Sequence, residues 1–409
     1  MKRKQTKQRA RRVSPSLADI RVVGIGGGGG NAVSRMARDF PRGVGFIAIN
    51  TDHQDLDACK VREKIYIGRS LTRGLGTGMN PDLGRQAAEE NRSEIAEAIK
   101  GADLVFLTAG LGGGTGTGGI PILAEVAKHS GALTVAVVTR PFSFEGAQRE
   151  RIATEGLMKL KDKVDALIVV PNDRIFNIIS KDTPILKAFD AIDDVLRNAL
   201  KGIVEIIATP GIINVDFADI RNIVQDAGSA VVGIGVASGP ERAVNAVNSA
   251  LNSPLLEMSA EGAKSVLFSI SGGRDLRMNE VNEAAKTVAQ IADPGAKIIF
   301  GAYHDRSLKH GRVKVTLIAT GFNGTSSGSL FGGQFAERQS ILGSFRSAVL
   351  EKTTPSPKAF TASAKGVSAA LEPDLEMPPR VQREESDAKK KEKESDVWDI
   401  PTFLRKKKK

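Results

Sequence analysis

Two glycine-rich stretches contain the residues best suited to binding a charged ligand. Residues 110–119 hold seven glycines in ten positions, and residues 24–30 hold six in seven. Glycine leaves the backbone N–H groups uncovered and permits positive φ. Each stretch precedes a segment with helical periodicity, so its free N–H groups lie at a helix N-terminus, where the helix dipole also favours an anion. The sequence therefore predicts a loop-and-helix site for the phosphates of a nucleotide.

Further polar residues follow the apolar runs that are typical of buried strands. Asn50-Thr51-Asp52 comes after the strand predicted at 45–49, and Glu145 comes shortly after the strand predicted at 133–139. An acid near the end of the second strand is typical of ribose recognition in dinucleotide-binding folds. Asn and Asp also favour simple turns, so a turn at 50–52 stays an alternative.

Strands and helices alternate along the first part of the chain, which predicts a Rossmann-like α/β domain with a doubly wound parallel sheet. The predicted strands are 21–25, 45–49, 65–67, 102–109, 133–139 and 166–170, and the predicted helices include 32–40, 80–100 and 120–128. Ligands of such sheets bind outside the carboxyl ends of the strands. Both glycine stretches, Asn50-Thr51-Asp52 and Glu145 follow strand ends, so we expect them to meet in one cleft.

A long helix and a second α/β unit follow. Apolar residues at spacings of three and four predict a helix over 183–207. A smaller C-terminal α/β domain is predicted from strands at 230–237, 265–271, 297–303 and 313–320 and helices at 241–251 and 278–291. The expected organisation is a disordered basic leader (1–19), a nucleotide-binding domain (20–182), a central helix (183–207), a C-terminal domain (208–322), a disordered linker (323–396) and a docking peptide (397–409).

The charge of the chain is concentrated at its two ends. The net charge is +11, but without the twelve basic residues of residues 1–12 and 405–409, 46 basic residues face 47 acidic ones. A folded body without a basic excess argues against nucleic-acid binding. The single cysteine, Cys59, excludes an internal disulfide, and no apolar run reaches the roughly 18 residues of a membrane span. We therefore expect a cytoplasmic protein without a transmembrane segment.

Two other classes of nucleotide-binding protein, the P-loop NTPases and the dehydrogenases, also use glycine-rich loops. A P-loop NTPase requires G-x-x-x-x-G-K-[ST], and this string does not occur in the chain. A dehydrogenase needs one glycine fingerprint, whereas this chain has two rich loops and a third glycine segment at 74–78. NAD binding therefore remains an alternative. Comparing the binding of NAD with that of other nucleotides would test it.

Asp216 and Asp219 stand at the predicted start of a further helix. Carboxylates at the N-cap and in the first turn satisfy free N–H groups and complement the helix dipole. The residues themselves therefore favour helix capping.

Seven motifs, in order, resemble the tubulin/FtsZ superfamily, and within it the bacterial FtsZ family. They are GIGGGGGNAV (24–33), AINTD (48–52), TRGLGTGMNPDLGR (72–85), TAGLGGGTGTGG (108–119), RPFSFEG (140–146), NVDFADIR (214–221) and DIPTFLR (399–405). The resemblance covers about residues 20–322 and 397–405. It implies a GTPase that self-assembles head to tail into protofilaments and forms the cell-division ring at midcell. A GTP-binding scaffold or sensor with little turnover is the alternative within the superfamily.

The resemblance also implies roles for individual residues. The phosphates of GTP or GDP would lie on Gly27, Gly28, Gly29, Gly30, Asn31, Gly114, Thr115 and Gly116. Glu145 and Arg149 would hold the ribose and its neighbours, and Asp193 would face the guanine beside Phe189.

The catalytic residues implied by the resemblance are Asp216 and Asp219, acting on the nucleotide of the neighbouring subunit. Mg²⁺ would be held mainly by the GTP phosphates and water, without an assigned protein ligand. Residues 397–405, with Trp398, Ile400, Phe403 and Leu404 close together, would dock on membrane-anchoring and regulatory division proteins. A tail packed against its own body is the alternative for that segment.

Overall fold

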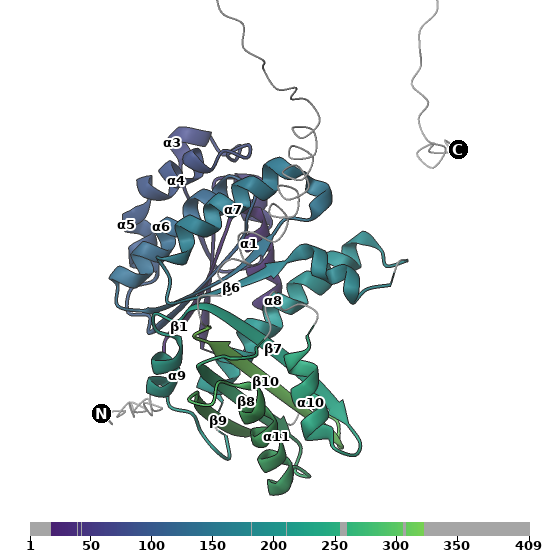
Figure 1. The fold of residues 1–409 in the computed structure, drawn as a ribbon. Helices are drawn as coiled ribbons and strands as arrows, with labels where there is room; N and C mark the ends of the chain where they lie inside the picture. The colour runs from purple at the N-terminus through teal and green to yellow at the C-terminus, as the bar shows by residue number, and fades with distance from the viewer. Residues whose placement is uncertain are drawn as a thin grey trace, which may run out of the picture. The chain divides into compact units, whose positions relative to one another are not determined.

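The structure, a computed structural model, describes residues 18–38, 40–41, 43–180, 182–209, 211–253, 260–305 and 308–322 (Figure 1). All of them belong to one compact unit, Met1–Ser344. Most of the expected leader, the linker and the docking peptide lie outside these ranges. Within the described residues, no helix is both long and apolar enough to cross a membrane.

The N-terminal half is built on a parallel sheet, as the sequence predicts. Its strands run in the order β3-β2-β1-β4-β5-β6, and every neighbouring pair is parallel. Their bounds are β1 (Ile20–Ile25), β2 (Val44–Asn50), β3 (Glu63–Tyr66), β4 (Leu104–Gly110), β5 (Leu133–Arg140) and β6 (Ala166–Pro171). Strands buried on both faces are near-continuous apolar runs, which is why the sequence located them well.

Helices cover both faces of this sheet (Figure 1). They are α1 (Gly26–Met36), α2 (His53–Ala58), α3 (Arg69–Thr72), α4 (Pro81–Glu90), α5 (Arg92–Ala98), α6 (Thr115–His129) and α7 (Ala147–Lys161), with short 3₁₀ turns η1 (Ser143–Glu145) and η2 (Asn172–Asn177). Alternate residues of β1 separate the two cores. Val23 and Ile25 pack in the core that includes α4 to α7, whereas Ile20 and Val22 pack in the core that includes α1.

The structure differs from the predicted helix bounds at three places. The helices predicted at 32–40 and 120–128 begin earlier, at Gly26 and Thr115, because glycines form their first turns. The helix predicted over 80–100 is divided at Asn91, whose side chain accepts the N–H of Gly68 at 3.0 Å. Its predicted start is confirmed, since Asn80 caps α4 by accepting the N–H groups of Asp82 and Leu83.

A long helix leaves this sheet and leads to the second half of the chain. α8 (Ile185–Ala208) has 24 residues and buries one face from Ile192 to Ile206. It is followed by the loop 211–216 and by α9 (Phe217–Val224). At 1.5 Å per residue, α8 is about 36 Å long.

The C-terminal half continues the same sheet. β7 (Gly228–Ser238) pairs in parallel with β6 at two positions, Ala166 with Gly228 and Leu167 with Ser229. The order continues β7-β10-β8-β9, with β10 antiparallel to both β7 and β8. The remaining elements are α10 (Arg242–Leu251), β8 (Ser265–Gly272), α11 (Met278–Ile291), β9 (Lys297–His304) and β10 (Arg312–Thr320). The second α/β unit of the sequence prediction is thus continuous with the first through this short pairing.

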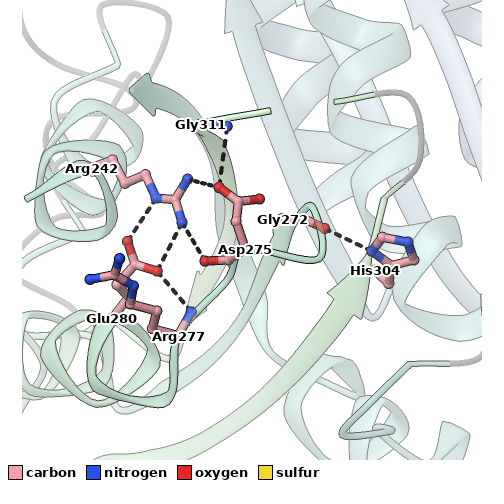
Figure 2. A network of polar contacts seen from close by, with 7 residues as sticks. All are labelled: Arg242, Gly272, Asp275, Arg277, Glu280, His304 and Gly311. Carbon is pink, nitrogen blue, oxygen red and sulfur yellow. Dashed lines mark hydrogen bonds and ion pairs between the residues drawn. The ribbon is translucent and has the colours of Figure 1, made fainter. Parts of the chain in front are cut away.

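A charged network holds the strand ends of this half together (Figure 2). The guanidinium of Arg242, which is 7% exposed, donates to Glu280 at 2.7 and 3.0 Å and to the carboxylate and carbonyl of Asp275 at 2.5 and 2.9 Å. The N–H of Gly311 donates to the same Asp275 carboxylate at 3.2 Å. These bonds lower the pKa of Asp275 to about 2. One arginine therefore links α10, α11 and two turns.

We expect Arg242→Met to lower the melting temperature of the ligand-free protein by several degrees. The substitution keeps most of the aliphatic side chain but leaves two carboxylates close together without their cation. Arg151→Met is the matched control, because Arg151 pairs with Glu155 on the exposed surface of α7, where such pairs contribute little. Calorimetry at neutral pH measures both, and equal shifts in the two variants would contradict the stabilising role of the network.

Candidate functional site

A cavity of about 310 Å³ opens at the carboxyl ends of β1, β4 and β5. Its walls come from the two glycine stretches, from the loop after β5 and from the N-terminal half of α8. The predicted convergence of the glycine stretches and Glu145 is therefore confirmed, whereas Asn50-Thr51-Asp52, expected in the same cleft, does not line the cavity. The side chains that line it include two acids, Glu145 and Asp193, and one cation, Arg149.

The glycine stretches approach one another so closely that side chains would not fit between them. A Cβ on Gly26, whose φ is +73°, would lie 2.9 Å from the backbone nitrogen of Gly116. A Cβ on Gly114 would lie 2.2 Å from Thr77 Oγ1. The N-termini of α1 and α6 are thereby brought to one end of the cavity, where their free N–H groups suit a chain of phosphates.

A hydroxyl cluster ties this end of the cavity to the loop before α4. Thr115 Oγ1 lies 2.7 Å from Thr51 Oγ1 and 3.1 Å from Thr77 Oγ1, and all three side chains are buried. Thr51 was predicted as part of a polar turn after the second strand. Its neighbour Asp52 instead caps α2, accepting the N–H groups of Gln54 and Asp55. Asp52 therefore has the local backbone-binding role that the alternative of a turn at 50–52 predicts.

The phosphate-binding residues expected from the resemblance fall into two groups. Gly27, Gly28, Gly114, Thr115 and Gly116 line the cavity. The other three, Gly29, Gly30 and Asn31, lie further along α1 and do not line it. Gly29 has a packing reason to be glycine, since a Cβ there would lie 2.5 Å from Thr108 O.

The opposite end of the cavity is formed by α8. Phe189, Ile192 and Asp193 lie on the helix face that lines it, so an aromatic ring and a carboxylate stand together there. Burial raises the pKa of Asp193 to about 6, an effect opposed by Arg35 and reinforced by Asp190 and Asp194. Arg35, in the last turn of α1, contacts Asp193 and lies 2.9 Å from Asp190. An ionised Asp193 is therefore a strong acceptor for N–H groups in the cavity.

The middle of the cavity offers groups for a sugar. Glu145 accepts the N–H of Phe142 and pairs with Arg149, both at 2.9 Å. Asn172 also lines the cavity, and its Oδ1 is buried without a hydrogen-bond partner among the described residues. A buried acceptor without a donor is costly, which indicates that a ligand supplies one. Sequence reasoning did not select Asn172, although its position directly after a predicted strand was a signal.

Large exposed apolar side chains lie on η1, on and after η2, and at the start of α8, the segments that supply Glu145, Asn172 and Asp193 to the cavity. Phe142 stacks on Phe144 at 4.7 Å and contacts Phe176 and Phe189 at 5.6 and 5.9 Å. The exposed fractions of Phe144 and Phe176 are 69% and 55%, and Leu186 is 73% exposed. We call Phe144, Phe176, Ile178, Ile185, Leu186 and Phe189 the apolar rim. Exposed apolar groups of this size gathered beside a site are typical of a protein interface.

Asp216 and Asp219 lie away from the cavity, beyond the other end of α8. From Asp193 to the end of α8 at Ala208, the helix advances about 22 Å. Asp216 is the N-cap of α9, with a long 3.5 Å contact from the N–H of Ala218, and Asp219 lies in the first turn. The capping geometry predicted from the residues is thus present, but its hydrogen bond is weak.

Comparisons with known proteins agree with this architecture. The model of the Tubulin/FtsZ family, GTPase domain, matches residues 19–180, and that of the FtsZ family, C-terminal domain, matches residues 228–323. An FtsZ dimer from M. jannaschii is 47% identical, with 75% of this chain and 89% of that chain covered and a TM-score of 0.70. A point mutant of FtsZ from M. jannaschii, in which tyrosine replaces a tryptophan, is 48% identical, covering 75% and 91%, with the same TM-score of 0.70.

A more distant structure shares the fold. CetZ2 from Haloferax volcanii, described as a GTPγS-bound protofilament, is 24% identical and has a TM-score of 0.66 over 80% of this chain and 99% of that one. The FtsZ matches decide the family, and this chain belongs to the tubulin/FtsZ family. It is a GTPase, and GTP and GDP are the nucleotides of its GTPase domain.

We expect GTP affinity to fall as the pH falls through about 6, by up to about tenfold per pH unit. The resemblance implies that Asp193 accepts the N–H groups of guanine, a carboxylate accepts more strongly when it is ionised, and the raised pKa means that Asp193 gains its proton in this range. In Asp193→Asn this dependence should disappear, while affinity at neutral pH is already low. GTP binding by wild type and variant, measured at pH 5.5 and 7.5, tests this. The nucleotide phosphates also change their charge between these pH values, but they do so equally for both proteins, so the difference between the two proteins reports on Asp193.

Asp194→Asn is the control for this experiment, because Asp194 is half-exposed and pairs with Arg197 on α8. It should keep a pH dependence of GTP affinity, moved slightly to lower pH, because the charge of Asp194 contributes to the raised pKa of Asp193. The same pH dependence in Asp193→Asn would contradict the assignment of Asp193 as the guanine acceptor.

Proposed function

We propose that this chain assembles head to tail and hydrolyses GTP at the interface between successive subunits. The observation that carries the proposal is the separation described above. The cavity lies near the start of α8, and the helix advances about 22 Å from Asp193 to its last residue, Ala208, before the loop with Asp216 and Asp219 begins. These carboxylates are too far away to act on the nucleotide of their own subunit, whereas a second copy placed end to end would bring them to it.

The phosphate end of the cavity lacks a group that could activate water. The described residues that line it there supply mainly glycine backbone and threonine hydroxyls, and the two acids that line the cavity, Glu145 and Asp193, come from η1 and α8. In the proposed reaction, water attacks the γ-phosphorus, and the bond to the β–γ bridging oxygen breaks to give GDP and phosphate. Asp216 and Asp219 of the next subunit would orient the water and take up its proton.

The donor set suits magnesium bound to the nucleotide. The described residues contain no cluster of three or more potential metal ligands, and threonine hydroxyls border the phosphate end. We infer that Mg²⁺ is held by phosphate oxygens and water beside Thr115, where it would neutralise the phosphate charge. The chain's own part is to hold the phosphates on α1 and α6, the ribose at Glu145, Arg149 and Asn172, and the guanine at Asp193.

Three observations support self-assembly into a division ring. The apolar rim is exposed on segments that also supply residues to the cavity, where an arriving subunit would cover it. One relative is described as a dimer, and the more distant CetZ2 as a protofilament. The same family supports a role in septum formation by a cytoplasmic ring at midcell. Residues 397–405, which lie outside the described ranges, are proposed to dock on membrane-anchoring and regulatory division proteins.

We expect GTP hydrolysis per subunit to rise with protein concentration above a threshold, because a complete site needs two subunits. Phosphate release and sedimentation, followed together with GTP and with GDP, measure this. Turnover that is independent of concentration in dilute monomers would contradict catalysis between subunits. GTP binding and sedimentation without phosphate release would favour a scaffold with little turnover.

We expect Asp216→Asn to bind GTP normally and to lose hydrolysis by about a hundredfold or more. Asparagine is as good an N-cap as aspartate but carries no charge, so this variant separates catalysis from capping. Asp219→Asn should behave in the same way. Normal hydrolysis in both asparagine variants would show that the carboxylates serve the helix alone.

A mixture of two defective proteins tests whether the carboxylates act between subunits. Asp216→Asn has an intact nucleotide cavity but an altered loop. Asp193→Ala has an altered cavity but an intact loop. We expect the mixture to hydrolyse more GTP than the sum of the two proteins alone, because the intact loop of one meets the intact cavity of the other. The absence of any gain, with both proteins present in the pellet, would contradict the proposal.

A further inference from the structure

The loop that carries Asp216 is bound to the outer edge of the sheet. β9 is the last strand in the sheet order, and its outer side pairs with the loop at one bridge, between Ile213 and Ala302. The N–H groups of Ile212 and Ile213 lie 2.7 and 3.1 Å from Ala302 O, and Ala302 donates back to Ile213 O at 3.0 Å. Backbone pairing of this kind fixes the position of the loop along the strand, because Ile213 must lie opposite Ala302.

The next residue of β9, Tyr303, is enclosed by the loop. It is 4% exposed, and its ring lies between two glycines. A Cβ on Gly211 would lie 2.9 Å from two ring carbons, and a Cβ on Gly301 would lie 2.7 Å from a third. The ring therefore fills space that a side chain at either position would need.

The hydroxyl of Tyr303 joins the loop to α8. It donates to the carbonyl of Ile206, in the last turn of α8, at 3.0 Å. In a continuing helix that carbonyl would accept the N–H of residue 210, but Pro210 has none. The tyrosine thus supplies the donor that the proline lacks.

The phenol oxygen also faces the residue before Asp216. Burial raises the pKa of Tyr303, and the backbone N–H of Val215 acts in the opposite direction. The phenol is therefore protonated at neutral pH and is available as a donor. One oxygen stands between the end of α8 and the backbone immediately before Asp216.

The end of β9 is itself anchored. His304 Nδ1 lies 3.3 Å from Gly272 O, and the N–H of Asp305 donates to the same carbonyl at 3.0 Å. Gly272 leads into the turn whose Asp275 binds Arg242, so the strand end is connected to the charged network (Figure 2). The end of β9, which carries Tyr303, is therefore held to β8 on the side away from the loop.

We propose that Tyr303 is a positioning residue for hydrolysis, which holds the loop 211–216 against α8 so that Asp216 and Asp219 are presented to the next subunit in one arrangement. The inference rests on the proposed function, because it assigns catalysis to that loop. Tyr303 touches neither the nucleotide cavity nor the carboxylates, and it acts through the backbone of the loop.

The test is Tyr303→Phe in the full chain, which removes the hydroxyl and keeps the ring. At saturating GTP we expect turnover per sedimented subunit to fall about tenfold, because small displacements of reacting groups are costly. GTP affinity should be unchanged, since the cavity is at the other end of α8. Amide hydrogen exchange of residues 211–215 should be faster than in the wild type.

Thr134→Val is the matched control. Thr134, 0% exposed at the start of β5, donates its hydroxyl to the carbonyl of Ala132 at 3.1 Å and contacts neither the loop nor α9 through that bond. It should lose stability as Tyr303→Phe does, but keep its turnover and the exchange rate of residues 211–215. An equal fall of turnover in both variants would overturn the proposal, because general loosening would then explain it.

Two further outcomes separate the inference from the proposed function. Unchanged turnover and unchanged exchange in Tyr303→Phe, beside an active wild type, would overturn the role of Tyr303 alone. A wild type that binds GTP but never hydrolyses it would overturn the proposed function, and the positioning role with it. If Tyr303→Phe does not sediment, faster exchange confined to residues 211–215 supports the proposal, and unchanged exchange overturns it.

Discussion

The close approach of two backbones, at the N-termini of α1 and α6, is the constraint on which the rest of the structure depends. The cavity end that suits phosphates exists because Gly26 and Gly116 lie nearly in contact, which any side chain would prevent. Parallel strands beneath them bring both helices to the same edge of the sheet. The hydroxyls of Thr51, Thr77 and Thr115 then fix the neighbouring loop to this edge. Free N–H groups, rather than cations, make this end of the cavity suitable for an anion.

The strands were predictable because buried parallel strands are apolar along their whole length. β4 and β5 were predicted within about two residues of their bounds for this reason. The starts of α1 and α6 were missed, because glycine is a poor helix former and its presence there reflects contacts between loops. The break at Asn91 was also missed, since it depends on a bond to Gly68 in a distant turn.

The candidate site was predictable in part. The glycine stretches and Glu145 could be placed from local pattern, because residues after strand ends meet at one edge. Asp193 came from the family resemblance, since a carboxylate on a helix gives no local signal of base recognition. Arg35 and Tyr303 owe their roles to neighbours that are distant in sequence, so no local pattern could reveal them. Asn172 had one local signal, its position just after a strand, but its unpaired buried oxygen becomes evident only in the folded chain.

The length of α8 sets the distance between the cavity and the loop that leads to Asp216. The helix has 24 residues, with the cavity residues Phe189 and Asp193 in its first half and the loop that leads to Asp216 just beyond its end. Inserting a single residue would turn everything after it by about 100° and move it by about 1.5 Å. Surface loops tolerate such changes easily, whereas this helix cannot absorb them without turning the carboxylates away. The length of α8 is therefore under tighter constraint than the identity of most side chains on its exposed face.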